Sequence, residues 1–338
     1  MAIGRSAPIT LCLVLSACVQ APVRQEEQSA LVWPAEPDVA RVAYVRSFAR
    51  AEDLGISGGF FERLASILLG RDELRLVRPM AVTVVGQNIF VADPGAMGVH
   101  RFDLEQHRYD LLRPADRALP SPVGLARGDD GEVYVTDSAL GSVFVIAPGA
   151  KTASPLPLGA KLKQPTGITF DPDRHHLYVV DTAAHRVNVF DRKGALISGF
   201  GQRGSADGEF NFPTHLWRDR DGRLYVTDAL NFRLQMFDGQ GRFLGKFGRQ
   251  GDGTGDIARQ KGVATDGFGH IYIVDALFHA LQVFDGEGRL LLSLGGRGHD
   301  RGEFWLPAGI FISDDNTIYV ADSYNQRVQV LRYVGGPT

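Results

Sequence analysis

The chain has 338 residues, of which 44% are hydrophobic and 22% are charged, and its formal net charge is −3. This length and apolar content are enough for a large buried core, which excludes an intrinsically disordered chain. The near balance of charges argues against a nucleic-acid-binding protein, because such a protein presents a strongly basic surface.

The first 17 residues have the features of an export signal. Arg5 precedes a short apolar run that ends in Leu15-Ser16-Ala17-Cys18. This run is shorter than the roughly 20 residues that a membrane-spanning helix needs. Small residues directly before a cysteine resemble the lipobox of bacterial lipoproteins, which implies cleavage before Cys18 and a lipid on its sulfur. An ordinary signal peptide, cut elsewhere, is the alternative.

Residues 18–38 are rich in Gln, Glu, Ala and Pro and are predicted to form a flexible tether. The tether would hold a single domain, residues 39–338, on the periplasmic face of the cell envelope. Val19 follows the cysteine, whereas an aspartate there favours inner-membrane retention in enteric bacteria, so the outer membrane is weakly favoured. Removal of the leader would leave Cys18 as the one cysteine, so no disulfide is expected.

Residues 39–75 contain one predicted strand and one predicted helix. Val42–Phe48, within a segment spanning 39–55, alternates between apolar and polar residues as a strand does. In the insert 56–75, Phe60, Leu64 and Ile67 fall at helical spacing, which predicts a short helix over 59–69. Two roles stay open for it, a cover on the domain or an element that touches a membrane or a partner.

Residues 76–333 consist of six similar copies of one unit. Each copy has a short alternating apolar run that ends in aspartate, and these aspartates recur at intervals of 44 or 47 residues. They are Asp93, Asp137, Asp181, Asp228, Asp275 and Asp322. The runs around them are strands rather than helices, because their apolar residues alternate instead of recurring every three to four positions. Four strands in a unit of roughly 40–50 residues predict an all-β, six-bladed β-propeller.

The best copies resemble the NHL repeat. The resemblance lies in Asp181-Thr-Ala-Ala-His-Arg186, Asp228-Ala-Leu-Asn-Phe-Arg233 and Asp322-Ser-Tyr-Asn-Gln-Arg327, and in the Gly-rich linkers that follow the fourth strands. It implies an NHL-type propeller. Copies one, two and five match less well, because Gly98, Ser142 and Ala280 replace the arginine.

The last copy has only three strands before the chain ends at Thr338. Val42–Phe48 is similar to the fourth strands of the other copies. We therefore expect it to complete blade six as the outer strand and so to close the ring.

The innermost strands line the channel of a propeller, so their side chains are the first candidates for a functional site. Five copies place Gly or Ala in a Pro-x-Gly-like start, and the fourth places His215 there, with Trp217 facing the same way. The position four residues after each aspartate gives two further candidates, His185 and His279. For each of these three histidines, the alternative is a structural or solvated side chain without a role in binding or catalysis.

One enzyme reading follows from a resemblance. Peptidylglycine α-amidating lyase has a similar architecture and holds zinc through Pro-His motifs in alternate blades. Only Pro213-Thr214-His215 approaches that motif, whereas Gly124 and Gly309 stand in the alternate blades. Because zinc needs three or four ligands, no metal site and no cofactor are predicted.

The sequence favours a monomeric, membrane-tethered, non-catalytic propeller that binds a protein, peptide or glycan of the cell envelope and no nucleic acid. The predicted binding residues are His215, Trp217, His185, His279 and two arginines of the linkers, Arg249 and Arg297. The alternative is a metal-dependent lyase or lactonase-type hydrolase with its channel site around His215, the one catalytic candidate.

Overall fold

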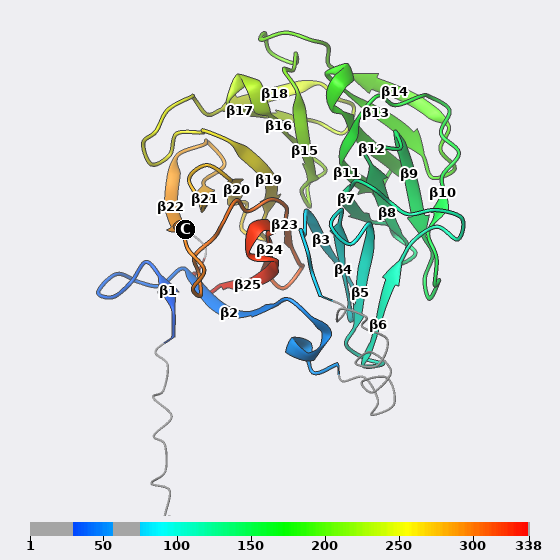
Figure 1. Cartoon of the computed structure of the whole chain (residues 1–338). Helices are drawn as coiled ribbons and strands as arrows, with labels where there is room; N and C mark the ends of the chain where they lie inside the picture. The colour runs from blue at the N-terminus through cyan, green and yellow to red at the C-terminus, as the bar shows by residue number, and fades with distance from the viewer. Residues whose placement is uncertain (1–29, 57–74, 337–338) are drawn as a thin grey trace, which may run out of the picture. The chain divides into compact units, whose positions relative to one another are not determined.

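The computed structural model describes residues 30–56 and 75–336. They form six antiparallel sheets arranged around a common axis (Figure 1). The predicted six-bladed propeller is therefore confirmed. None of the helices in these ranges is long and apolar enough to cross a membrane. The predicted helix at 59–69 and the predicted lipidation site Cys18 lie outside the described residues.

Each blade is an antiparallel meander whose first strand faces the axis. Blade one consists of β3 (Ala81–Val85), β4 (Asn88–Asp93), β5 (Gly98–Asp103) and β6 (Arg108–Leu112). Blade two consists of β7 (Pro122–Arg127), β8 (Val133–Asp137), β9 (Ser142–Ile146) and β10 (Ser154–Pro155). Blade three consists of β11 (Pro165–Asp171), β12 (His176–Asp181), β13 (Arg186–Asp191) and β14 (Leu196–Phe200).

The second half of the ring repeats this order. Blade four consists of β15 (Pro213–Arg218), β16 (Leu224–Asp228), β17 (Arg233–Phe237) and β18 (Phe243–Phe247). Blade five consists of β19 (Gln260–Thr265), β20 (Ile271–Asp275), β21 (Ala280–Phe284) and β22 (Leu290–Gly295). Blade six contains β23 (Ile310–Ile312), β24 (Thr317–Asp322) and β25 (Arg327–Tyr333) from the end of the chain.

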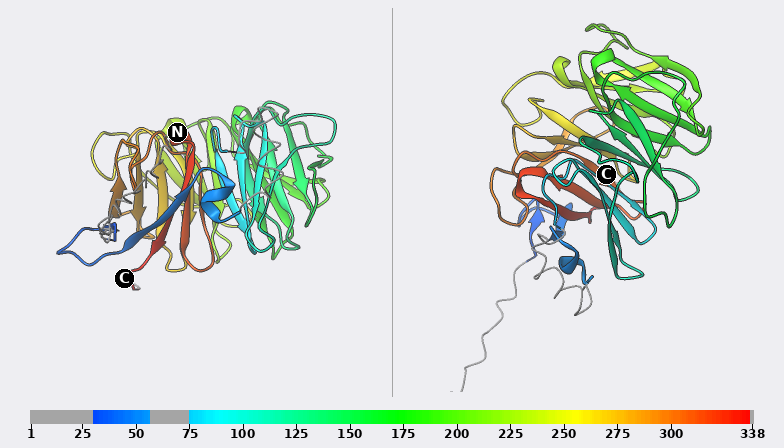
Figure 2. Two further views of the ribbon diagram at one scale, coloured as in Figure 1. Left: turned by 60° about the horizontal axis from the view of Figure 1, so that its bottom comes forward. Right: turned by 45° about the vertical axis from the view of Figure 1, so that its right-hand side comes forward.

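The N-terminal strand β2 (Val42–Phe48) closes the ring as predicted. It pairs antiparallel with β25, from Val42 opposite Tyr333 to Phe48 opposite Val328. The two strands lie side by side in both views of Figure 2. A fifth strand, β1 (Val32–Trp33), pairs with the outer edge of β2. The tether predicted over 18–38 is thus wrong at its C-terminal end, because Val32–Trp33 is part of blade six.

Short 3₁₀ helices follow several strands: η1 (Ala51–Leu54), η2 (Thr182–Ala184), η3 (Ala229–Asn231) and η4 (Ser323–Asn325). The last three stand between the second and third strands of their blades. They begin directly after the repeat aspartate and end on a residue in the left-handed backbone conformation. Each turn brings the chain back sharply enough to start the antiparallel third strand.

The core lies between the blades. Within residues 30–56 and 75–336, six buried apolar clusters each join the facing surfaces of two neighbouring blades. Phe48 of blade six packs edge-on against Phe102 of blade one, with ring centroids 5.4 Å apart. The junction that the N-terminal strand completes is thus packed like the other five.

Candidate functional site

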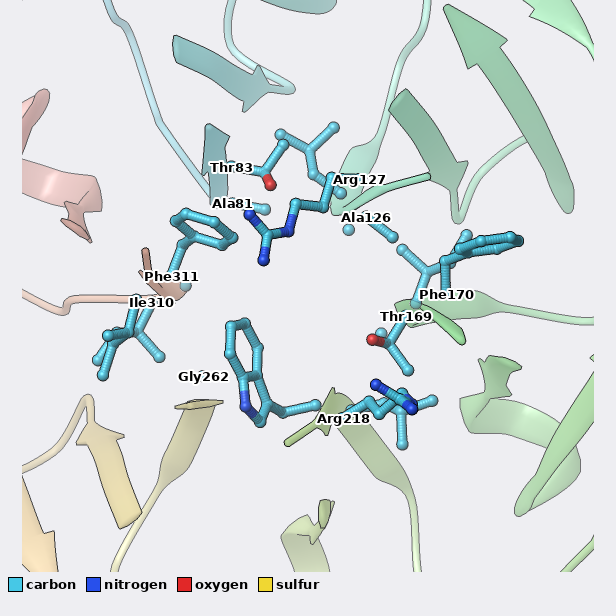
Figure 3. Close-up of a pocket in the computed structure, with 18 of the residues that line it drawn as sticks. Ala81, Thr83, Ala126, Arg127, Thr169, Phe170, Arg218, Gly262, Ile310 and Phe311 are labelled. Atoms are coloured by element: carbon cyan, nitrogen blue, oxygen red, sulfur yellow. The ribbon is translucent and has the colours of Figure 1, made fainter. Parts of the chain in front are cut away.

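A cavity of about 340 Å³ opens at one mouth of the channel. It lies where the innermost strands end and turn into the second strands. Its lining includes Thr83, Thr169, His215, Trp217 and Phe311 and, from the turns, Arg127, Arg218, Arg220 and Asp314. Figure 3 shows that the hydroxyl groups of Thr83 and Thr169 and the guanidinium of Arg127 point into this space.

Glycines narrow the channel at the other end of the innermost strands. A Cβ atom at Gly124 would lie 2.2 Å from the carbonyl oxygen of Thr166 in the next blade. A Cβ atom at Gly167 would lie 2.7 Å from the Cα atom of His215. These contacts are closer than real Cβ atoms allow, so the glycines of the Pro-x-Gly starts let neighbouring innermost strands touch. The same ring of positions lines the cavity, which extends from it to the turns at the opposite ends of these strands.

His215 is the one member of this ring of six positions with a long side chain, and it lines the cavity. Its Nδ1 atom lies 3.2 Å from the Thr214 hydroxyl. Burial, together with the nearby Lys261 ammonium, lowers the pKa of His215 to about 3. The imidazole is therefore neutral at physiological pH and offers hydrogen bonds rather than a charge.

Trp217 also lines the cavity. Its indole nitrogen donates to the Thr265 hydroxyl across 2.9 Å, from blade four to blade five. Its ring lies edge-on to Phe311 of blade six, with centroids 5.9 Å apart. The pair forms an aromatic wall whose orientation is fixed by the Trp217–Thr265 hydrogen bond.

Charged side chains from alternate blades meet over the mouth. Arg127 of blade two donates from Nη2 to Oδ1 of Asp314 in blade six across 2.9 Å, and from Nη1 to Oδ2 across 3.3 Å. Arg220 of blade four donates to the backbone carbonyl of Asp314 across 2.7 Å. Hydrogen bonding to Arg127 and the positive charges of both arginines lower the pKa of Asp314, so its carboxylate is ionised at neutral pH.

His185 and His279 do not join His215. Nδ1 of His185 accepts the backbone N–H of Phe212, and Nδ1 of His279 accepts that of Leu306. Neither side chain lines the cavity. The equivalent position adopts φ between 53° and 61° in all six blades, which makes it a turn position. These two histidines therefore hold the linker that enters the next blade.

The two predicted arginines lie in linkers that lead into the innermost strands, away from the cavity. Arg249 donates from Nε to Asp256 in its own loop across 2.6 Å, and its side chain is exposed. Arg297 is exposed, and its backbone forms an isolated parallel β-bridge with that of Phe304 in the same loop. They can contribute only to a surface at the opposite end of the channel.

Among the described residues, one group of at least three acidic, His or Cys side chains could share a metal ion: Asp129, Asp130 and Glu132. Arg192 contacts all three carboxylates and lies 3.0 Å from that of Glu132. The arginine occupies the place where a cation would bind. His215 is not part of this group, and its ring of glycines supplies no further ligand.

Sequence reasoning missed Arg127, Phe311, Thr83 and Asp314. A signal for the first three was present, because residues two or three positions after the Gly of the Pro-x-Gly-like starts line the cavity in most blades. At the second position these are Thr83, Ala126, Thr169, Trp217 and Phe311, whereas Ala264 of blade five is not among the lining residues. At the third position they are Arg127, Phe170, Arg218, Thr265 and Ile312.

Comparison with known proteins agrees with this architecture. The NHL-repeat family profile matches residues 162–190 and 304–331, which belong to blades three and six. The chain is therefore a six-bladed β-propeller with NHL repeats in two of its blades, three and six.

Curated relatives match over short stretches. One stretch of 128 residues is 27% identical to peptidyl-glycine alpha-amidating monooxygenase of Mus musculus and covers 33% of this chain and 13% of that protein. Another, of 76 residues, is 37% identical to NHL repeat-containing protein 2 of Gallus gallus and covers 20% of this chain and 10% of that protein. The matched stretches thus span about a tenth of the length of these relatives.

Solved structures share the fold at low identity. An auxiliary nutrient binding protein from Bacteroides thetaiotaomicron is 14% identical with a TM-score of 0.60, over 77% of this chain and 70% of that one. A streptogramin B lyase is 14% identical with a TM-score of 0.56, over 76% and 80%. A chain of a nidogen/laminin complex is 19% identical with a TM-score of 0.54, over 72% and 86%. At such identities these likenesses show the fold alone.

The pKa of His215 gives a prediction for stability against pH. The folded-state pKa of about 3 lies below the ordinary 6.5. The stability that depends on neutral His215 is therefore fully present above pH 6.5 and is lost as the pH falls toward 3. At pH 5 the loss is about 2 kcal/mol. Between pH 7 and pH 5, the free energy of unfolding of the parent protein should therefore fall by about 2 kcal/mol more than that of His215→Gln. Urea unfolding at the two pH values measures both changes.

The exposed His299 provides the control, because its ring contacts the Asn325 side chain at the surface. His299→Gln should follow the parent protein at both pH values. Parallel pH profiles for the parent and the His215 variant would show that the imidazole is not buried in its neutral form.

Proposed function

We propose that this protein is a non-catalytic binding propeller of the bacterial cell envelope, anchored through a lipid on Cys18. It binds a protein, peptide or glycan partner by inserting part of that partner into the mouth of the channel. The observation that carries the proposal is the cavity of about 340 Å³, in which aromatic and charged side chains from several blades converge. Pockets of this size, apolar with a few placed polar groups, are the usual form of a binding site.

The binding test uses the mature chain without its lipid as bait in an extract of the cell envelope. Trp217→Ala combined with Phe311→Ala removes the aromatic wall and should abolish capture of the partner. Arg249→Gln combined with Arg297→Gln changes the opposite end of the channel and should leave capture intact. Loss of the partner in the second variant alone would place the binding surface at the linkers and overturn the proposed site.

The anchor has its own test. Cys18→Ala should move the protein from the membrane fraction to the soluble fraction and abolish incorporation of labelled fatty acid. A cysteine variant that still sediments with the membrane and carries the label would overturn the lipid anchor.

The alternative function is a metal-dependent lyase or hydrolase centred on His215. It draws support from the partial likeness to peptidyl-glycine alpha-amidating monooxygenase and from the neutral imidazole, which is the protonation state of a metal ligand. The donors present weigh against it, because the Gly positions of the other blades hold only Gly or Ala. One equivalent of zinc or calcium in the purified protein, lost in His215→Ala, would reverse this ranking.

A further inference from the structure

We infer that the cavity at the channel mouth binds a carboxylate attached to a flat apolar group, with Arg127 holding the carboxylate in place of Asp314. This inference rests on the proposed function and names the chemical class of the ligand. Three features support it: the contacts of Arg127, the exposure of the ion pair that it forms with Asp314, and polar groups of the lining that lack hydrogen-bond partners among the described residues.

Asp314 occupies the place that a ligand carboxylate would take. Both of its carboxylate oxygens accept hydrogen bonds from the Arg127 guanidinium, which is the two-point geometry that arginine offers to carboxylates. The two residues come from blades six and two, so their contact spans the mouth above blade one. The same guanidinium carbon lies 5.7 Å from the ring centroid of Phe311, so the carboxylate site adjoins an aromatic surface.

Replacement of the Asp314 carboxylate by a ligand at Arg127 would change the stability of the fold little. The Asp314 side chain is 73% exposed and that of Arg127 is 44% exposed, and ion pairs so open to water stabilise a fold weakly. The turn around Asp314 is held by its neighbour Asp315, which accepts hydrogen bonds from the hydroxyls of Ser313 and Thr317. The Asp314 carboxylate can therefore leave Arg127 while the turn keeps its form.

The other charged groups at the mouth also have partners. Arg220 donates to the backbone carbonyl of Asp314, which stays in place when the carboxylate leaves Arg127. Asp129 contacts His175 and Arg192, and Asp219 accepts a hydrogen bond from the Tyr225 hydroxyl across 3.0 Å. Arg218 is paired with Asp171 and Asp173. Release of Asp314 would leave the positive charge of Arg127 facing the cavity, which favours an anionic ligand over a cationic one.

Two buried polar atoms of the lining lack hydrogen-bond partners among the described residues. They are the hydroxyl of Thr83, whose residue is 1% exposed, and Nε of Arg218. Figure 3 shows the Thr83 hydroxyl and the Arg127 guanidinium on the same side of the cavity. A buried hydroxyl without a partner costs free energy, and a ligand oxygen brought to this side by Arg127 would supply the partner. The aromatic wall of Trp217 and Phe311 suits a flat apolar group beside it.

The test compares indole-3-acetate with indole-3-acetamide, which have the same shape and differ in charge. Isothermal titration calorimetry on the mature chain should show that the acid binds at least about tenfold more tightly than the amide. Arg127→Gln should remove this difference. Asp314→Asn removes the competing carboxylate, so it should tighten binding of the acid several-fold and leave that of the amide unchanged. Circular dichroism and thermal melting of both variants verify that they fold.

The matched controls use an exposed ion pair outside the cavity. Arg117 binds Asp116 through Nε and Nη2, and both side chains are more than half exposed. Arg117→Gln and Asp116→Asn should leave binding of both probes unchanged. Equal binding of acid and amide by the parent protein, or an acid preference that survives Arg127→Gln, would overturn the inference.

Failure of the inference is distinguishable from failure of the proposed function. If neither probe binds but envelope capture is lost on removing the aromatic wall, the carboxylate assignment is overturned and the binding site stands. If neither probe binds and no partner is captured, both are overturned.

Discussion

Replacing Asp228 by alanine is expected to lower the free energy of unfolding by about 3–5 kcal/mol. The Asp228 carboxylate is fully buried and accepts hydrogen bonds from the Asn211 backbone and from the side chains of Asn231, Arg233 and Gln235. Its loss would leave a buried guanidinium without its carboxylate, because Arg233 is only 7% exposed. Urea unfolding of the purified variant measures the effect.

Asp137→Ala is the matched comparison. Asp137 is equally buried, but it accepts only backbone N–H groups, from Ser121, Ala139 and Leu140, and has Ser142 in place of the repeat arginine. Its loss should cost about 1–3 kcal/mol, the penalty for buried donors left unsatisfied. Equal losses of unfolding free energy in the two variants would contradict the expectation that the unpaired Arg233 accounts for most of the loss in blade four.

These aspartates show what sequence periodicity can predict. The repeat interval, the strand that precedes each aspartate and its role in fixing the turn are all local features, and local features recur from copy to copy. Where the repeat arginine is present, Asp228 pairs with Arg233 and Asp322 with Arg327, whereas Nε of Arg186 in blade three lacks a hydrogen-bond partner among the described residues. The architecture could therefore be predicted from the residues alone.

The site could be predicted only in part, because it depends on contacts between blades. His215 was a candidate because the other five copies hold Gly or Ala at its position. Trp217 was a candidate because it lies two residues further along the same strand. Arg127 and Asp314 lie 187 residues apart and meet only when the ring closes. Contacts between consecutive blades also decide the roles of His185 and His279. Each accepts a backbone N–H from a residue 27 positions later, in the linker to the next blade, and neither lines the channel.

The boundary of blade six illustrates a second limit of sequence patterns. Val32–Trp33 is too short to alternate visibly and is followed by Pro34 and Pro37, so composition alone predicts a tether. Trp33 nevertheless packs against the linker before β23, where a Cβ atom at Gly302 would lie 2.4 Å from its indole ring. Tertiary packing of one large aromatic side chain outweighs the local preference for a flexible chain.

Closure of the ring by β2 leads to the second large prediction. Phe48→Ala is expected to lower the free energy of unfolding by about 3–5 kcal/mol, because it deletes a buried aromatic ring without refilling its space. Phe48 is 1% exposed and packs on Phe102 of blade one, so the cavity would open at the junction between the first and last blades. Val45→Ala on the same strand is the control, since Val45 is 47% exposed and should change stability by less than about 0.5 kcal/mol. Equal, small losses in the two variants would mean that the ring holds together without the packing of the N-terminal strand, and that blade six is closed by β25 alone.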